Sequence, residues 1–250
     1  MLTTLGTQLL LWDIWYKFLR AVSTRVARSE MARNLPSMAR RLLAIVHTYS
    51  GMHIQFDARL RTEPPAQTVV CANHQSVADI AMLITALPNH AVRFVAKREL
   101  SRGFPAVSEV LRTQRHALID RHGNPRTVAR ELKRLSRQVS SGITPVIFPE
   151  GTRSRTGEVG AFQTAGVRTL LLGKPVPITA VAVDGGYRLA SMQQLRDAGP
   201  DDHYRAKMVG VFDHDGTKGG IVKALESART AIVRQVEHWR ASDTARQGNQ

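Results

Sequence analysis

A short apolar strand that runs directly into a polar turn occupies residues 68–79, whose sequence is TVVCANHQSVAD. The first five residues are mostly β-branched or small and apolar, a composition that favours a buried strand. The polar residues after them mark the end of the strand, and we expect a helix to include Asp79 in its first turns. This order of strand, turn and helix is typical of an α/β fold.

Similar β-branched runs recur along the rest of the chain, and helical stretches separate several of them. The runs fall at residues 92–96, 117–120, 146–148, 176–183 and 207–212. Strands that alternate with helices predict an α/β fold, with a mostly parallel sheet flanked by helices.

Periodicity places two helices in this α/β region. One begins at Asn124-Pro125, which supplies a capping residue and a proline at the first helical position. Its predicted buried face comprises Val128, Leu132, Leu135 and Val139. The last helix spans about residues 220–239, and its predicted buried residues are Ile221, Leu225, Ala228, Ile232 and Val236.

Residues 8–24 show the period of an amphipathic helix. Trp12 and Trp15 lie on its apolar face, and tryptophan prefers the interface of a membrane because its ring is amphipathic. Up to residue 41 only Asp13 and Glu30 are acidic, and the basic residues are Lys17, Arg20, Arg25, Arg28, Arg33, Arg40 and Arg41. These features favour a membrane surface, although an ordinary core-facing helix would have the same period.

We expect three parts in the chain. Residues 1–54 would hold N-terminal membrane-associating helices, with a second helix over about residues 37–49 that forms an amphipathic helical hairpin with the first. Residues 55–241 would form the α/β domain. The polar residues 242–250 would be a disordered tail.

The charge of the chain is strongly positive. The 250 residues carry 35 Lys and Arg against 20 Asp and Glu, a formal net charge of +15. Such a protein attracts polyanions, of which an anionic membrane and a nucleic acid are the common ones. The basic residues are scattered over helices with no aromatic-interleaved platform, so we expect the membrane surface and no nucleic acid.

The single cysteine, Cys71, excludes an internal disulfide framework and fits a reducing compartment. The nine histidines show no spacing typical of metal ligands, so no metal site is expected. No run of apolar residues is long enough to predict a membrane-spanning helix, and the N-terminus does not resemble a signal peptide. We therefore expect a peripheral or monotopic protein on the cytoplasmic face of the inner or plasma membrane.

His74 and Asp79, five residues apart in the turn after the strand, are the first candidate catalytic pair. An alcohol is almost fully protonated at neutral pH, so acyl transfer to a hydroxyl needs a base. Histidine suits that task, and a carboxylate on its other ring nitrogen fixes the tautomer. By itself the spacing is a weak signal, because a histidine at a helix cap with a surface aspartate would look the same.

A second polar loop follows the run 146–148 and has the sequence FPEGTRS at residues 148–154. The planar guanidinium of Arg153 can bind two phosphate oxygens. Gly151 has no side chain, so the backbone there can approach a ligand closely. Thr152 and Ser154 add hydroxyl donors. The alternative interpretation is a capping turn with a surface arginine.

The pair His74-x4-Asp79 followed by the loop 148–154 resembles the glycerolipid acyltransferase family, which includes the 1-acyl-sn-glycerol-3-phosphate (lysophosphatidate) acyltransferases. The resemblance covers about residues 72–183. It implies that His74 is the base and Asp79 its orienting partner. It also implies that Glu150, Gly151, Thr152 and Arg153 hold the acceptor, with Arg121, in the Asp-Arg pair after the run 117–120, as a second phosphate ligand.

The reaction that this resemblance implies is direct attack of a lysophospholipid hydroxyl on the thioester of acyl-CoA or acyl-carrier protein. The expected product from 1-acyl-sn-glycerol-3-phosphate is phosphatidic acid. No cofactor is expected, because the acyl thioester is itself a substrate. Glycerol-3-phosphate or a lysolipid without phosphate is the alternative acceptor, and a basic binding protein without catalysis is the alternative of another class.

Three positions depart from the family pattern. Arg115 stands where the family usually has glycine, Gln163 where it often has lysine, and Ala180 where it has a second proline. These departures concern the pocket for the acceptor headgroup and leave the proposed base in place. A hydrolase that uses Cys71 or Ser76 as nucleophile is less consistent with the sequence, because Cys71 lies within an apolar strand and Ser76 lacks a Gly-x-Ser-x-Gly turn.

Overall fold

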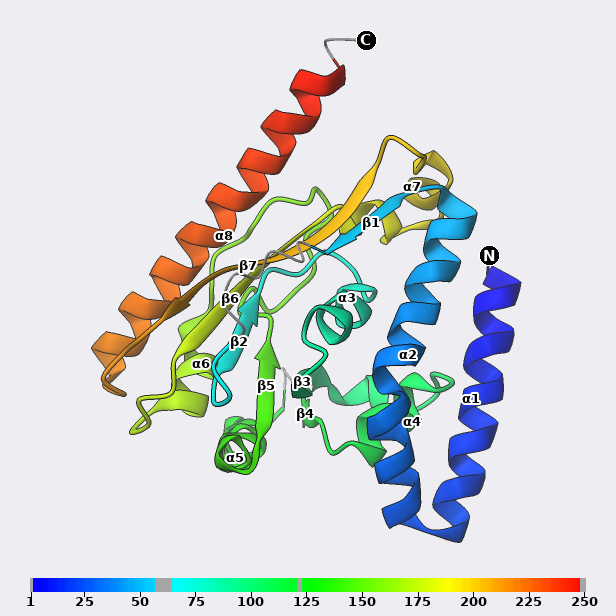
Figure 1. Cartoon of the computed structure of the whole chain (residues 1–250). Helices are drawn as coiled ribbons and strands as arrows, with labels where there is room; N and C mark the ends of the chain where they lie inside the picture. The colour runs from blue at the N-terminus through cyan, green and yellow to red at the C-terminus, as the bar shows by residue number, and fades with distance from the viewer. Residues whose placement is uncertain (1, 57–63, 121–122, 248–250) are drawn as a thin grey trace.

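The computed structural model describes residues 2–56, 64–120 and 123–247. Within these residues seven strands form one sheet in the order β1-β7-β6-β2-β5-β3-β4. The strands are β1 (His53–Phe56), β2 (Val69–Ala72), β3 (Ala91–Lys97), β4 (Ala117–Ile119), β5 (Ile143–Ile147), β6 (Ile178–Asp184) and β7 (His203–Phe212). Helices cover both faces of this sheet (Figure 1). The predicted α/β class is confirmed.

Most neighbouring strands are parallel, as predicted. The exception is β7, which pairs antiparallel with β6 and carries a register shift opposite Ala180 and Val181. Strand β1 then pairs in parallel with β7 at the edge of the sheet. Strand β1 was not predicted from the sequence, because four residues are too few to show a strand period.

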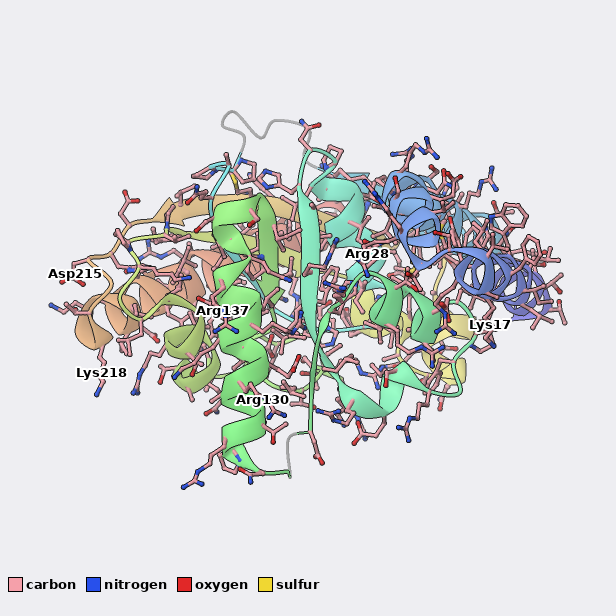
Figure 2. The ribbon with its side chains drawn as sticks, turned by 90° about the horizontal axis from the view of Figure 1, so that it is seen from below. Lys17, Arg28, Arg130, Arg137, Asp215 and Lys218 are labelled. Atoms are coloured by element: carbon pink, nitrogen blue, oxygen red, sulfur yellow. The ribbon has the colours of Figure 1, made fainter. Side chains whose placement is uncertain are left out.

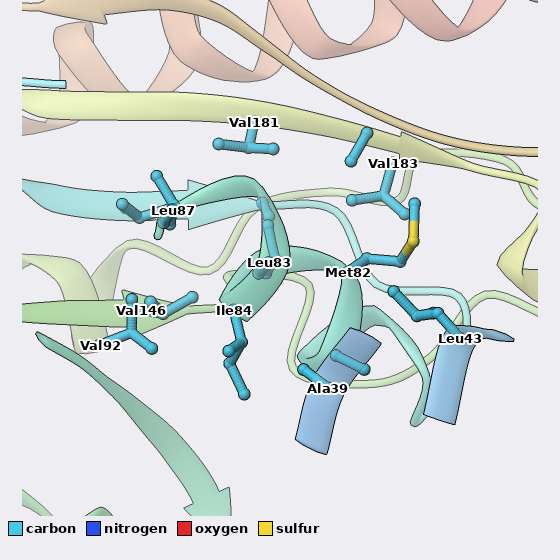
Figure 3. Packing of buried hydrophobic residues seen from close by; sticks show 14 of the residues in the cluster. Ala39, Leu43, Met82, Leu83, Ile84, Leu87, Val92, Val146, Val181 and Val183 are labelled. Atoms are coloured by element: carbon cyan, nitrogen blue, oxygen red, sulfur yellow. The ribbon is translucent and has the colours of Figure 1, made fainter. Parts of the chain in front are cut away.

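The helices form two layers. On one face lie α3 (Asp79–Ala86) and α4 (Val107–Thr113), together with the N-terminal helices. On the other lie α5 (Pro125–Arg137), α6 (Thr164–Leu171) and α8 (Lys218–Gln247), and Figure 2 labels Arg130 and Arg137 on α5 and Lys218 at the start of α8. The short α7 (Met192–Asp197) precedes β7. Figure 3 shows the first layer, where Leu83 and Met82 of α3 pack among Val146, Val181 and Val183 of the sheet.

The N-terminal helices form the predicted hairpin, but both are longer than expected. Helix α1 spans Leu2–Val22 and α2 spans Thr24–Ser50, separated only by Ser23, whose hydroxyl accepts a hydrogen bond from the Val26 N–H. The expected second helix, 37–49, began too late, because α2 continues through Pro36. A proline normally interrupts a helix, and here the packing of α2 on the sheet layer outweighs that preference.

The two α/β helices placed from the sequence are present. In α5, Leu132 and Leu135 are buried, and Asn124 accepts the predicted capping bond from the Arg126 N–H. The five residues predicted to be buried on the last helix are all buried. The predicted disordered tail is wrong over residues 242–247, because α8 continues to Gln247 and Asp243 pairs with Arg205 of β7. Residues 248–250 lie outside the described residues, and the division of the chain at residues 54 and 55 stays a prediction.

Candidate active site

The two polar loops singled out in the sequence meet at one edge of the sheet. Strands β2 and β5 are parallel neighbours, with Val70 opposite Val146 and Cys71 opposite Ile147. Their C-terminal ends therefore lie side by side, and the loops that follow them start from the same place. A hydrogen bond of 2.8 Å from the Ser154 N–H to the His74 carbonyl joins the two loops.

His74 and Asp79 are in direct contact. The Nδ1 atom of His74 lies 2.8 Å from Oδ2 of Asp79. Asp79 is the first residue of α3, and its Oδ2 also accepts the backbone N–H groups of Gln75 at 2.6 Å and Ser76 at 2.8 Å. The carboxylate thus stabilises the turn that carries the histidine. The same turn directs the imidazole toward the carboxylate.

The His74 ring is fixed on a second side by stacking. Its centroid lies 3.9 Å from that of Phe148, with an angle of 14° between the planes. Since a carboxylate accepts hydrogen bonds, Nδ1 is the donor to Asp79, and Nε2 has no hydrogen-bond partner among the described residues. Asp79 is fully buried, whereas the His74 side chain keeps 15% of its surface exposed. A histidine held in this way has the geometry that general-base catalysis requires.

Glu150 connects the two loops through its carboxylate. One oxygen accepts the His74 N–H at 2.8 Å and the other accepts the Gly160 N–H at 3.1 Å. Burial is the main influence on this carboxyl and raises its pKa, while the two backbone bonds partly oppose the shift. Both oxygens already have partners, so the contact with an acceptor that the resemblance implies for Glu150 stays a prediction.

Gly151, Thr152 and Arg153 line the outer side of the second loop. Gly151 has φ of 73°, a conformation that favours glycine, and no atom lies within 4 Å of the position where a Cβ would stand. Thr152 and Arg153 are exposed, and Arg153 forms no ion pair with any residue that the structure describes. Their side chains are therefore free to meet a ligand. Arg121 lies outside the described residues.

Several supporting residues were not found from the sequence. Gln75 is fully buried, and its amide donates to the Gly157 carbonyl at 2.9 Å and to Asp184 at 3.2 Å. Arg240 of α8 donates to the same Asp184 oxygen at 2.9 Å. Only Gln75 gave a signal, as a polar residue directly after the apolar strand. The contact of α8 with this network could not be seen, because more than 50 residues separate Arg240 from Asp184.

Arg115, one of the departures from the family pattern, adopts a backbone conformation that favours glycine. Its φ is 56°, in the left-handed region that glycine occupies without strain. Its side chain is exposed and its carbonyl accepts two bonds from Arg134. The local backbone therefore retains the geometry of a glycine turn despite the substitution.

An apolar cavity of about 590 Å³ lies between the N-terminal hairpin and the α/β layer. It reaches the active-site turn at Ser76, two residues after His74. Its other walls come mostly from α1, α2, α3 and α4 and include Leu9, Trp12, Ala39, Leu43, Ile84, Val110 and Leu111. A cavity with so few polar groups suits a hydrocarbon chain.

Outward from this cavity, α1 exposes a row of large apolar side chains. Those at least half exposed are Leu10, Leu11, Ile14, Trp15, Phe18 and Val22 on α1, continued by Val26 on α2.

Across the described part of the chain, no helix combines the length and apolarity needed to cross a membrane. Among the same residues, no cluster of three or more histidine, cysteine or acidic side chains could hold a metal ion.

Comparison with known proteins gives one family. A family model described as Acyltransferase matches residues 53–184. A 1-acyl-sn-glycerol-3-phosphate acyltransferase of Cocos nucifera is 28% identical over 131 residues, which cover 52% of this chain and 41% of that protein. The alpha form from Ovis aries is 28% identical over 176 residues, covering 68% of this chain and 58% of that protein. The chain thus spans about half the length of the curated relatives it matches.

A solved structure shares the whole architecture. The crystal structure of the 1-acyl-sn-glycerophosphate (LPA) acyltransferase PlsC from Thermotoga maritima matches with a TM-score of 0.67 and 21% sequence identity. The match covers 94% of this chain and 98% of that one, so it includes the N-terminal helices as well as the α/β layer. At this identity the likeness is one of fold.

Proposed function

This chain belongs to the acyltransferase family, and we propose that it transfers a fatty acyl group from a thioester to the free hydroxyl of a lysophospholipid. The observation that carries the proposal is the contact of His74 with Asp79 beside the apolar cavity. A base with an open nitrogen and a compartment for a hydrocarbon chain are the two things that this reaction needs.

The proposed step is a direct displacement. His74 Nε2 accepts the proton of the acceptor hydroxyl while the oxygen attacks the thioester carbonyl carbon. A carbon–oxygen bond forms and the carbon–sulfur bond breaks. The imidazolium then gives the proton to the leaving thiolate. Asp79 stabilises the charged ring throughout, as a carboxylate partner does for a catalytic histidine. The products are an ester and a free thiol, and no acyl-enzyme forms.

The preferred acceptor is 1-acyl-sn-glycerol-3-phosphate, which would give phosphatidic acid. The names of the relatives support this choice, and so does the exposed Arg153, whose guanidinium can bind two phosphate oxygens. Gly151 and Thr152 would complete the contact, and Arg121 is proposed as a second phosphate ligand. Glycerol-3-phosphate or a lysolipid without phosphate remains the alternative, because Arg115 and Gln163 depart from the family pattern in this region.

The donor is proposed to be acyl-CoA or acyl-carrier protein, with its acyl chain in the cavity. No cofactor is required, since bond cleavage in the thioester drives the transfer. The exposed apolar row on α1 and the net charge of +15 support attachment to an anionic membrane surface. This is where a lysophospholipid would be found, so we propose a peripheral position at the cytoplasmic face of the membrane.

One experiment tests the function and separates the acceptors. Purified protein is given a labelled acyl thioester and, in separate reactions, lysophosphatidate, glycerol-3-phosphate and a neutral lysolipid. The proposal expects labelled phosphatidic acid at the highest rate. Faster labelling of another acceptor would show that this acceptor is the preferred substrate. If no acceptor is labelled, the proposed transfer is contradicted.

A second experiment tests the membrane surface. Replacing Ile14 and Phe18 with asparagine keeps the charge and removes apolar area that the folded chain leaves exposed. We expect weaker binding to vesicles of phosphatidylglycerol, with the unfolding temperature unchanged. A gel-shift assay with DNA serves as control, because a nucleic-acid binder would shift DNA in a salt-dependent way and ignore the vesicles.

A further inference from the structure

Tyr204, on the antiparallel strand β7, contacts the catalytic carboxylate from the far side. Its hydroxyl donates a hydrogen bond of 2.6 Å to Oδ1 of Asp79, and both side chains are fully buried. The two residues are 125 positions apart in the sequence. A charge-assisted bond of this length is among the strong ones in proteins.

The two oxygens of Asp79 have different partners. Oδ2 accepts hydrogen bonds from the His74 ring and from the backbone N–H groups of Gln75 and Ser76. For Oδ1, Tyr204 is the one hydrogen-bond partner within the described residues. If the phenol oxygen is removed, this oxygen is left buried without a donor.

The surroundings of the pair are closely packed. Gly186 packs directly against the pair, and a Cβ at that position would stand 2.6 Å from Asp79 Oδ1 and 3.2 Å from the Tyr204 oxygen. The aromatic ring of Tyr204 belongs to the same buried cluster as Met82 and Val183. Burial, reinforced by the negative charge of Asp79, raises the pKa of Tyr204 well above its usual range, so the phenol stays protonated and remains a donor.

From this geometry we infer that Tyr204 is a positioning residue for the acyl transfer proposed above, acting on His74 through Asp79. Its bond draws part of the carboxylate charge toward Oδ1. This limits how strongly Asp79 stabilises the protonated imidazole, and it holds the carboxylate plane against rotation. Tyr204 itself does not touch a substrate, because it is fully buried behind Asp79.

The other charged groups near the pair come from three elements. Glu150, in the loop after β5, binds the His74 N–H. Asp184, at the end of β6, binds Gln75 and is paired with Arg240 of α8. Substitution of Tyr204 leaves these groups in place, so a change in the titration of His74 can be assigned to the Asp79 bond.

The test is the variant Tyr204→Phe, which removes one oxygen and keeps the ring. Without the bond the charge of Asp79 concentrates toward His74 and favours the protonated ring. We therefore expect the acidic limb of the kcat/KM–pH profile to move to higher pH by roughly half a unit. The maximal kcat should nevertheless fall by about tenfold, because the carboxylate that orients the His74 ring is no longer held against rotation. The Michaelis constants of both substrates should stay within about twofold.

The matched control is Tyr16→Phe. Tyr16 is a buried tyrosine of α1 whose hydroxyl accepts a hydrogen bond from Asn34, so the variant loses the same atom without loss of a bond to Asp79. It should leave the pH profile unchanged. If both variants lower activity without moving the acidic limb, Tyr204 has only a structural role and the inference is overturned.

A second measurement does not depend on activity. The ring protons of His74, identified by their loss in His74→Gln, are titrated by NMR in the wild type and in Tyr204→Phe. A higher titration midpoint in the variant supports the inference, and identical midpoints overturn it. Because this readout needs no turnover, it separates failure of the inference from failure of the proposed function.

A double-substitution cycle completes the test. With Asp79→Ala as background, adding Tyr204→Phe should change the residual rate by less than twofold, since the carboxylate that links Tyr204 to His74 is absent. A full further tenfold loss would show that Tyr204 acts by another route.

Discussion

Asp79→Asn isolates the charge of the catalytic pair from its geometry. Asparagine has almost the same shape as aspartate. Its amide oxygen can take the place of Oδ2 and still accept the N–H groups of Gln75, Ser76 and the His74 ring. The amide nitrogen would then face Tyr204, whose hydroxyl can turn to accept a hydrogen bond. We therefore expect the turn to persist and the carboxylate charge to be lost.

The size of the effect follows from the distance. His74 Nδ1 and Asp79 Oδ2 are 2.8 Å apart, which places the charge centres of the imidazolium and the carboxylate about 4 Å from each other. At an effective dielectric constant near 20, their attraction is about 4 kcal/mol. If that attraction develops as His74 takes the proton, its loss lowers kcat by about 10³-fold.

The assay follows labelled acyl transfer under saturating thioester and acceptor. Asp79 is fully buried and reaches neither substrate, so both Michaelis constants should stay close to those of the wild type. Circular dichroism and the unfolding temperature serve as controls for the fold. A variant that keeps a tenth or more of the wild-type kcat with an intact fold would refute the proposed role of the carboxylate charge.

Three further predictions address other parts of the account. Arg153→Ala should raise the Michaelis constant of the acceptor about tenfold or more while leaving that of the thioester unchanged, because one charge-assisted contact to phosphate is lost; equal losses for both substrates would contradict a role in acceptor binding. Arg115→Gly should stabilise the protein by about 0.5–1 kcal/mol, measured by urea unfolding, because relief of the strain at φ 56° exceeds the entropy cost of glycine; a loss of stability would contradict that strain. Burial raises the pKa of Glu150, so the native state holds this proton more tightly than the unfolded state, and the free energy of unfolding of the wild type should fall relative to that of Glu150→Gln as pH rises from about 4.5 through the raised pKa. If the difference in the free energy of unfolding between the two proteins does not change with pH, the raised pKa of Glu150 is contradicted.

Features whose residues lie close together along the chain could be predicted from the sequence. The strand 69–72 and the last helix were found because each has a clear local pattern, and the meeting of His74 with Asp79 follows from their places in one turn. The proximity of the loops 73–79 and 148–154 followed from a resemblance, and the parallel pairing of β2 with β5 now supplies its physical cause.

Contacts between distant segments could not be found in the same way. Tyr204 lies before the predicted run 207–212, in the part of β7 that the sequence did not predict, so its bond to Asp79 had no local signal. The length of α2 was underestimated because Pro36 normally ends a helix, while packing against the sheet layer sustains it. The end of α8 was missed because its polar residues are ordered by a pair between Asp243 and Arg205 of β7.

The most direct test of the central claim is the rate of phosphatidic acid formation by His74→Ala. In the proposed reaction His74 Nε2 accepts the proton of the attacking hydroxyl, and no other described base occupies its place beside Phe148. We predict a fall in kcat of about 10²–10⁴-fold or more, with an unchanged circular dichroism spectrum. Near-normal turnover by a folded His74→Ala variant would contradict the claim.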